Sequence, residues 1–564
     1  MKRRLTIALI ALAVLLITGC AKLSVAFDAQ NETAIFLQEV DKNQRLAPPA
    51  EPEREGYTFL GWYTDISGGE RWDFSQPVTQ DMNLYARWEP VELAITVFAD
   101  KKRDQSQQVA VMYGEPVPLP PLPEIPGYRF TQWTKDKNGL VPWDPKNKAL
   151  SDTTLYAQWE PLVSSITYHQ QIEEQHYETQ SIETYHYGEE ISIVAPEPLP
   201  DFAFIGWNTE ADGSGQMYKP GDMLTMGEED MTLYPQWTIP VSAAAAGSSH
   251  TMVLLSDGTL LTVGSNTDGQ LGDGTRKSSS TPITVAKSVS TLSAGGGFSL
   301  FVDTQGVLWG MGGNYQGQLG NPDLYVPVTK PVRIMDQVRD VAAGVSHTLI
   351  LRTDGSLWAM GNNEDGQLGD GSTISRSTPV SVADAVQAIA AGSYHSLFIT
   401  EDGTLWGMGW NEAGQLGGDA DISQKRPVAI MHQVQAVSAG AYHTLVITED
   451  GTLWGWGSNV NGQLGIDSMT ESATPVELAS DVHMIASGYN HSWYIDGNGT
   501  LWGAGDNAYG QLHPDQPKQI AEWQPLYESV DDVSAGKDFS LIISQGLLWA
   551  IGSDEYHQLG AWEQ

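Results

Sequence analysis

The chain has 564 residues, a formal net charge of -39 and a hydrophobic content of 41%, which includes 19 Trp and 21 Tyr. The length predicts several domains, and this apolar and aromatic content excludes a globally disordered chain. Because so acidic a surface repels phosphate backbones, we expect no nucleic-acid partner.

The first twenty residues have the pattern of a secretory signal. Three basic residues (2–4) precede an apolar run (5–17) that is too short to span a bilayer comfortably. Residues 17–20, Ile-Thr-Gly-Cys, resemble the cleavage box of bacterial lipoproteins. The resemblance implies a lipidated Cys20 that anchors the protein on the extracellular face of a bacterial membrane. An ordinary signal peptide with a chance cysteine is the alternative.

Cleavage there would remove three positive charges and take the mature chain from -39 to -42. Cys20 is also the only cysteine of the sequence, so no disulfide can form within the chain. The stability of the folded domains must therefore come from packing.

Residues 21–238 contain a β-rich repeat in three copies, which we place at 21–90, 91–161 and 162–238. The sequence GYTFLGW at 56–62 and LYARW at 84–88 return as GYRFTQW at 127–133 and LYAQW at 155–159. A more divergent copy has FAFIGW at 202–207 and LYPQW at 233–237. Apolar residues with period two predict about four strands and no clear helix in each copy. The copies resemble the internalin-type, or Listeria–Bacteroides, repeat, which implies small β-grasp-like modules that act as stalks or spacers.

A second repeat fills residues 239–564. Its anchoring glycine recurs at steps of 48 or 49 residues, at Gly247, Gly295, Gly344, Gly392, Gly440, Gly488 and Gly536. A fixed period of this length is typical of solenoids and propellers, and seven copies suggest a closed ring.

One copy, residues 434–478, shows the expected strands. Apolar runs at 434–439, 444–448, 452–456 and 474–478 are separated by a glycine turn, an Asp-Gly hairpin signal and a polar loop. Four short antiparallel strands of this kind make one propeller blade.

The pattern A-G-x-x-H, D-G-x-L-W and G-x-N-x-x-G-Q-L-G resembles the regulator of chromosome condensation repeat, whose members are seven-bladed β-propellers. The resemblance implies an all-β protein: a seven-bladed propeller preceded by three β-grasp-like modules. The chain departs from the pattern at Phe298 and Phe539, which replace His, and at Leu261, which replaces Trp. The last copy ends without a fourth strand, which leaves the closure of the ring open.

Three sets of residues recur at one position of the repeat each. They suggest catalytic or metal-binding residues, but a structural role explains them better. Five histidines predict a ring nitrogen that bonds to turn backbone rather than a metal site: His250, His347, His395, His443 and His491. Six tryptophans, each at the same phase of an apolar strand, predict residues that pack the blades: Trp309, Trp358, Trp406, Trp454, Trp502 and Trp549. Four aspartates predict turn chemistry: Asp257, Asp354, Asp402 and Asp450.

A polar loop that contains Asn266, Asp268 and Asp273 suggests calcium only superficially, because it lacks the alternating acidic ligands and closing Glu of a calcium-binding loop. We expect no metal and no cofactor. No nucleophile elbow, phosphate loop or zinc motif occurs, so we expect no enzyme.

These observations favour a membrane-anchored extracellular protein, a monomer, that binds a protein or glycan partner. The alternatives are a secreted inhibitor of an extracellular enzyme, as in the β-lactamase inhibitor protein built on this propeller, and a cryptic hydrolase. Eukaryotic relatives that act on a small GTPase and chromatin are no guide for a secreted bacterial lipoprotein.

Strand counting predicts the binding face. In an up-and-down blade, the A-G loop and the G-x-N-x-x-G loop leave on one rim and the Asp-Gly turns leave on the other. The first rim gathers aromatic residues, the usual anchors of interfaces: Tyr315, Tyr394, Trp410, Tyr442, Tyr489, Tyr509 and Tyr556. We predict that Tyr394, Tyr442 and Tyr489 form one patch. The alternative is that some of these rings fold back to fill the central channel.

Overall fold

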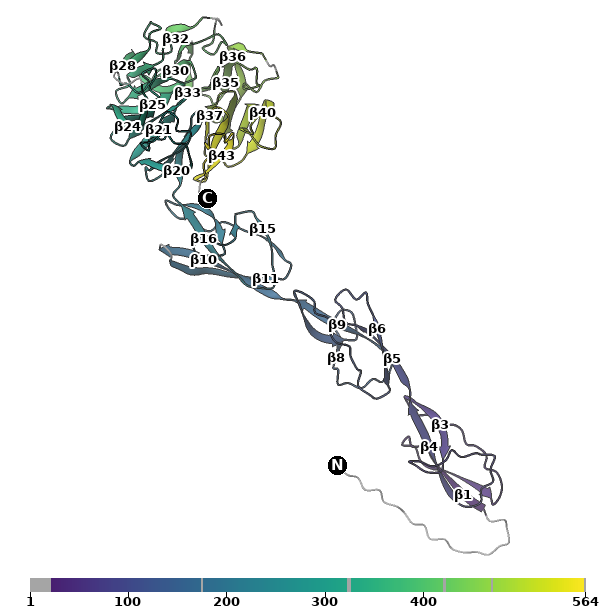
Figure 1. Cartoon of the computed structure of the whole chain (residues 1–564). Coiled ribbons are helices and arrows are strands. Elements are labelled where there is room, and N and C mark those ends of the chain that lie inside the picture. Colours follow the sequence, from purple (N-terminus) through teal and green to yellow (C-terminus); the bar gives the residue numbers. More distant parts are fainter. Residues whose placement is uncertain (1–21, 174–175, 322–325, 419–421, 468–469, 562–564) are drawn as a thin grey trace. The chain divides into compact units, whose positions relative to one another are not determined.

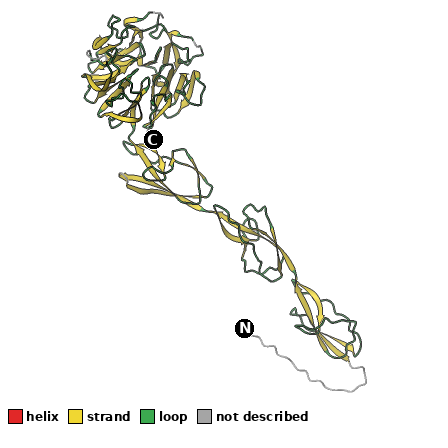
Figure 2. Ribbon diagram, in the orientation of Figure 1, coloured by secondary structure: helices red, strands yellow, loops and turns green. Residues whose placement is uncertain are grey.

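The computed structural model describes residues 22–173, 176–321, 326–418, 422–467 and 470–561, and all regular structure in these ranges is β-strand (Figure 2). None of these residues forms a helix with the length and apolar character needed to cross a membrane. Cys20 lies outside the described residues. The chain divides into two compact units, and the division passes through the third module.

The first two modules are mixed sheets (Figure 1). Each has a small core of aliphatic residues with a few aromatic rings. The sheet of the first module has the order β2-β1-β4-β3, with β1 parallel to β4, and that of the second has the order β6-β5-β9-β7-β8. In the first core the rings of Phe27 and Trp62 meet edge to face, with centroids 4.8 Å apart. The strands are β1 (Lys22–Asp28), β2 (Phe36–Asp41), β3 (Tyr57–Tyr63), β4 (Met82–Pro90), β5 (Glu92–Phe98), β6 (Gln107–Met112), β7 (Tyr128–Thr134), β8 (Pro142–Trp143) and β9 (Thr153–Pro161).

The third module has a five-stranded sheet of order β11-β10-β16-β13-β14 and a separate pair, β12 and β15. Trp207 is buried in it and donates its indole N–H to the backbone oxygen of Val194, 2.8 Å away. The strands are β10 (Val163–Glu173), β11 (His176–His186), β12 (Glu190–Ser192), β13 (Ala203–Asn208), β14 (Met217–Tyr218), β15 (Met223–Thr225) and β16 (Met231–Thr238).

The described residues from 241 onward form seven antiparallel sheets, six with four strands and the last with three. Each sheet is one blade with strands in chain order, as the repeat predicts. The second strand of each blade is buried along nearly its whole length, because its two faces pack against neighbouring blades.

The first, innermost strands are β17 (Val241–Ala246), β21 (Val289–Ala294), β25 (Val338–Ala343), β29 (Val386–Ala391), β33 (Val434–Ala439), β37 (Val482–Ser487) and β41 (Asp532–Ala535). The second strands are β18 (His250–Leu255), β22 (Phe298–Asp303), β26 (His347–Arg352), β30 (His395–Thr400), β34 (His443–Thr448), β38 (His491–Asp496) and β42 (Phe539–Ser544). The third strands are β19 (Leu260–Gly264), β23 (Leu308–Gly312), β27 (Leu357–Gly361), β31 (Leu405–Gly409), β35 (Leu453–Gly457), β39 (Leu501–Asp506) and β43 (Leu547–Gly552). The outer strands are β20 (Ser279–Ala286), β24 (Val328–Met335), β28 (Arg376–Ala383), β32 (Gln424–Met431), β36 (Ser472–Ala479) and β40 (Gln519–Tyr527).

The ring closes without exchange of a strand between its ends. The innermost strand of the first blade, β17, contacts β41 and β42 of the last blade. The backbone N–H of Ala246 donates to Oγ of Ser534 at 3.0 Å, just as Ala343 donates to Ser293 between the second and third blades. The junction between the two ends therefore repeats an ordinary contact between blades.

The three-stranded last blade corrects one sequence prediction. Trp549, on the edge strand β43, is 45% exposed, so the prediction that it is a blade-packing residue is wrong. Nζ of Lys219 lies 5.0 Å from the centre of this ring. The other five tryptophans of the set are half-buried. Trp309, for example, stacks on Phe301 of its own blade and packs against a core cluster that includes Leu254 of the first blade.

Candidate binding face of the propeller

The loops of the predicted face are held rigidly by the glycine and histidine of the A-G-x-x-H motif. At Gly440, an added Cβ would lie 2.1 Å from Cε1 of His443, so only glycine leaves room for the ring. The same contact exists in the two blades where Phe replaces His, because Gly295 lies under the ring of Phe298. The glycine of the motif thus leaves space for the buried aromatic ring three residues later in the chain.

Each of these histidines bonds to the next blade, so the predicted bond to turn backbone is wrong. Nε2 of His443 lies 2.8 Å from Oγ of Ser492, and Nε2 of His491 lies 2.9 Å from Oγ of Ser540. The Ser540 hydroxyl donates to the backbone oxygen of Gln511 at 2.8 Å. The Nε2 atom of His491 must therefore carry the proton and donate it to the serine.

The second loop of the rim is fastened by its own side chains. In the third blade, Oδ1 of Asn363 accepts the N–H of Leu368 at 2.9 Å, and Oε1 of Gln367 accepts the N–H of Asp365 at 3.0 Å. Asn266 makes the same bond to Leu271 and also donates to Asp273. No group of three or more His, Cys, Asp or Glu residues suited to a metal is found in the part of the chain that the structure describes.

The Asp-Gly turns also agree with their predicted role. Oδ1 of Asp257 accepts the N–H of Thr259 at 2.8 Å, and Oδ1 of Asp354 accepts the N–H of Ser356 at 3.0 Å. Gly258 and Gly355 have positive φ in these turns.

Four of the seven predicted aromatic residues lie together. The ring centroids of Tyr394 and Tyr442 are 6.3 Å apart, and those of Trp410 and Tyr442 are 5.2 Å apart. Tyr489 continues the cluster, because its centroid lies 5.7 Å from that of Tyr442 and the two hydroxyl oxygens are 3.3 Å apart. The contact between Trp410, from the loop after β31, and Tyr442, from the loop after β33, places both kinds of loop on one rim. Burial and the bond to Tyr489 raise the pKa of Tyr442 to about 12.

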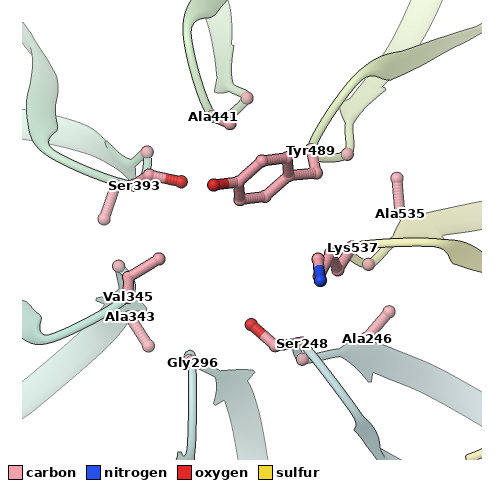
Figure 3. Close-up of a pocket in the computed structure, with 18 of the residues that line it drawn as sticks. Ala246, Ser248, Gly296, Ala343, Val345, Ser393, Ala441, Tyr489, Ala535 and Lys537 are labelled. Atoms are coloured by element: carbon pink, nitrogen blue, oxygen red, sulfur yellow. The ribbon is translucent and has the colours of Figure 1, made fainter. Parts of the chain in front are cut away.

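Tyr489 has a second environment, because its ring reaches into the central channel (Figure 3). It is the first residue after the glycine, as are Ser248, Ser393 and Lys537, whose side chains also point to the channel. Tyr394 and Tyr442 are the second residue after theirs and do not line the channel. The channel-filling alternative therefore holds for Tyr489. The one-residue offset in the motif could have revealed this from the sequence.

The remaining three tyrosines of the predicted set, Tyr315, Tyr509 and Tyr556, are 46% to 59% exposed. Among the described residues, none of them has a ring contact with the cluster. The hydroxyl of Tyr315 instead donates to Oδ1 of Asp268 at 3.0 Å.

A pocket of about 440 Å³ lies over the cluster, and the sequence reasoning missed part of its wall. Tyr394, Trp410 and Tyr442 line it together with Asp365, Ser458 and Glu471. Asp365 comes from the third blade and Glu471 from the fifth, so the pocket spans the loops of three blades. Burial raises the pKa of Asp365, and the charges of Glu364 and Glu412 raise it further. The conformations of separate loops decide which carboxylates line this pocket, so no single sequence motif predicts them.

Family models match both halves of the chain. The RCC1-like domain matches residues 211–433, and the regulator of chromosome condensation (RCC1) repeat matches residues 434–463, 482–511 and 450–495. The Listeria-Bacteroides repeat domain matches residues 24–87, 96–158 and 165–236.

Known proteins resemble parts of the chain. A protein of Evansella cellulosilytica named "Putative membrane protein" is 34% identical over 244 residues, which cover 42% of this chain and 35% of the relative. Internalin H of Listeria monocytogenes is 34% identical over 124 residues, or 21% of this chain and 22% of that protein. The chain thus spans about a third or less of these relatives.

Among solved structures, human WBSCR16 has a TM-score of 0.50 and 22% identity, and the match covers 61% of this chain and 97% of that one. A likeness at this identity shows the fold alone. Together with the repeat matches, it establishes that the chain carries a β-propeller of RCC1 repeats preceded by three Listeria–Bacteroides repeats.

Proposed function

We propose that the protein is a cell-surface binding protein whose propeller presents the face around Tyr394, Trp410 and Tyr442 to a partner protein. Lipidated Cys20 anchors the chain to the membrane, and the three repeat modules separate the propeller from that anchor. The names of the relatives, a membrane protein and an internalin, support a cell-surface location.

The observation that carries the proposal is the aromatic cluster itself. Three half-buried rings from neighbouring blades line one pocket. The loop that follows Trp410 is held by an internal hydrogen bond, from the N–H of Leu416 to Oδ1 of Asn411 at 2.7 Å. Rigid aromatic residues lose little conformational entropy on binding and are frequent anchors of interfaces. The Asp-Gly rim offers instead short turns whose carboxylates bond to their own backbone.

The test is capture of partners from culture medium and cell-surface extract by the purified protein, with each captured protein then titrated in pure form. Replacing Tyr394, Trp410 and Tyr442 by Ala should weaken binding by at least about thirtyfold, because one good aromatic anchor contributes about 2 kcal/mol or more. The matched control replaces Tyr315, Tyr509 and Tyr556 by Ala and should bind normally. Equal binding by both triple variants, with unchanged melting temperature, would reject this face.

A further inference from the structure

We propose that the pocket over Tyr394, Trp410 and Tyr442 binds a lysine or arginine side chain of the partner protein. This inference rests on the proposed function and specifies which chemistry the partner presents. It depends on the geometry of the rings, on two carboxylates in the pocket wall and on the absence of a cation among the described residues of that wall.

The rings form walls rather than a filled core. The planes of Tyr394 and Tyr442 are 29° apart, and the plane of Trp410 meets that of Tyr442 at 66°. All three remain partly exposed beside the 440 Å³ pocket. Faces of Trp and Tyr attract a desolvated cation through the negative potential above the ring, and several faces around one cavity add their effects.

The pocket wall also carries negative charge that nothing described neutralises. Asp365 and Glu471 line the pocket, and neither has an ion pair with any of the described residues. The charged groups that act on Asp365 are Glu364 and Glu412, which are both acidic. Arg376, a basic residue of the same loop region, is already engaged by Asp370 at 2.6 Å. Lys425 and Arg426 lie against Gly366 and Gly371 of this loop, but neither lines the pocket. An incoming cation would therefore meet attraction without having to displace another.

Charge complementarity selects this occupant over others. The chain has a net charge of -39, so a basic partner is favoured at long range as well as in the pocket. A neutral sugar can stack on the same rings, but it gains nothing from the excess carboxylates. An acidic group would be repelled.

The experiment is a titration of the full-length protein labelled with 5-fluorotryptophan, observed by fluorine NMR. The resonance of Trp410 is assigned as the one that disappears in Trp410→Phe. The probes are N-acetylargininamide and N-acetyllysinamide, with N-acetylcitrullinamide and N-acetylnorleucinamide as neutral analogues of matched shape. At least one cationic probe should shift the Trp410 resonance saturably, and its neutral analogue should bind at least about tenfold more weakly.

Variants separate the two contributions to binding. Asp365→Asn should weaken the binding of the cationic probe by about fivefold to tenfold. Glu401 is an exposed carboxylate on the Asp-Gly rim, and Glu401→Gln should leave this binding unchanged. Tyr442→Phe keeps the ring and should bind within about twofold of the parent, and Tyr442→Leu should lose about tenfold. If Tyr442→Leu shows broadened signals from the other tryptophans, the Asp365→Asn comparison alone decides.

Three results would overturn the inference: no saturable shift with either cation, equal shifts with cations and neutral analogues, or a shift with chitotriose alone. These failures differ from failure of the proposed function. If the triple alanine variant loses its partner while no cation binds, the binding face stands and only the cation pocket is wrong. If the triple alanine variant captures the partner as well as the parent protein does, the proposed function is wrong whatever the titration shows.

Discussion

Nε2 of His347 lies 2.9 Å from Oγ of Ser396, a residue 49 positions later and one blade further around the ring. The same hydroxyl donates to the backbone oxygen of Gln367 at 2.8 Å. A buried hydrogen-bond network thus crosses the boundary between blades. It joins a histidine, a hydroxyl and a glutamine backbone oxygen, and all three residues recur at fixed positions of the repeat. The network explains why the motif keeps His followed directly by Ser or Thr.

A double-mutant cycle tests this network. In the two blades with Phe instead of His, the facing hydroxyl is Thr, and it still donates to a glutamine backbone: Thr348 to Gln318 at 2.8 Å and Thr251 to Gln558 at 2.6 Å. We expect His347→Phe alone to destabilise the propeller by about 1–3 kcal/mol, through a lost hydrogen bond and strained packing. Adding Ser396→Thr should restore part of that loss, with a coupling energy of about 0.5 kcal/mol or more.

Thermal melting of the parent, both single variants and the double variant measures the coupling. Ser396→Ala is the comparison, because it leaves the Gln367 oxygen and the His347 donor both without their partner and should cost more than Ser396→Thr. Strictly additive effects would contradict a direct contact between the two residues.

The same histidines predict acid sensitivity. Burial lowers the pKa of His250 and His347 to about 4, and that of His395, His443 and His491 to about 3. In the unfolded chain each binds a proton near its ordinary pKa of 6.5. Between these values the unfolded state binds more protons, so the free energy of unfolding falls as the pH falls. The stabilisation is complete above pH 6.5 and is lost below it.

The expected slope is steep. Each histidine contributes about 1.4 kcal/mol per pH unit, so five contribute on the order of 7 kcal/mol per unit, which is comparable to the stability of a whole domain. Asp532 acts in the opposite direction, because burial raises its pKa to about 6, but it is one group against five. We expect the melting temperature to drop sharply between pH 6.5 and pH 5, and less sharply in the His347→Phe, Ser396→Thr double variant. A melting temperature that stays constant over this range would show that the histidines are not buried in neutral form.

The strands and the blades were predictable because their signals are local. In the fifth blade, the predicted strand 434–439 coincides with β33, and the other three predicted strands overlap β34, β35 and β36. Period-two apolar runs, a glycine turn and an Asp-Gly hairpin each act within a few residues. The three-stranded last blade was predictable for the same reason.

Contacts between blades were harder to predict. The partner of His347 lies one full repeat away, so inspection of a single copy suggests the nearer turn backbone. The exposure of Trp549 follows from the missing outer strand, which changes the surroundings of a residue that keeps its motif position. Asp365 and Glu471 enter the pocket only because loops of three blades converge there.

The predicted lipid anchor has a direct test. Cys20→Ala should release the protein from the membrane fraction or leave it unprocessed, because the thiol is the group that receives the lipid. Fractionation of cells with immunodetection measures both outcomes, and Thr18→Ser, which keeps the cysteine, is the control. Normal cleavage with full membrane retention of Cys20→Ala would exclude a lipid anchor at this residue.

The boundary at residue 239 gives the last prediction. Residues 233–238, which we considered as a source of the missing strand, belong to β16 and pair with β13 of the third module. The first blade instead depends on residues just after the boundary: Val241 donates its N–H to the backbone oxygen of Gly546 at 2.8 Å, and Pro240 accepts the N–H of Ser256 at 2.8 Å. A chain of residues 239–564 keeps both bonds and should melt in one transition, within about 2–4 °C of the longer protein if the lost contact of Lys219 with Trp549 contributes no more than about 1 kcal/mol. A chain of residues 243–564 loses both bonds and the apolar packing of Val241, so its first and last blades should separate at a lower temperature. The near-ultraviolet circular dichroism of the tryptophans follows both transitions. Cooperative melting only when the third module is present would move the boundary toward the N-terminus.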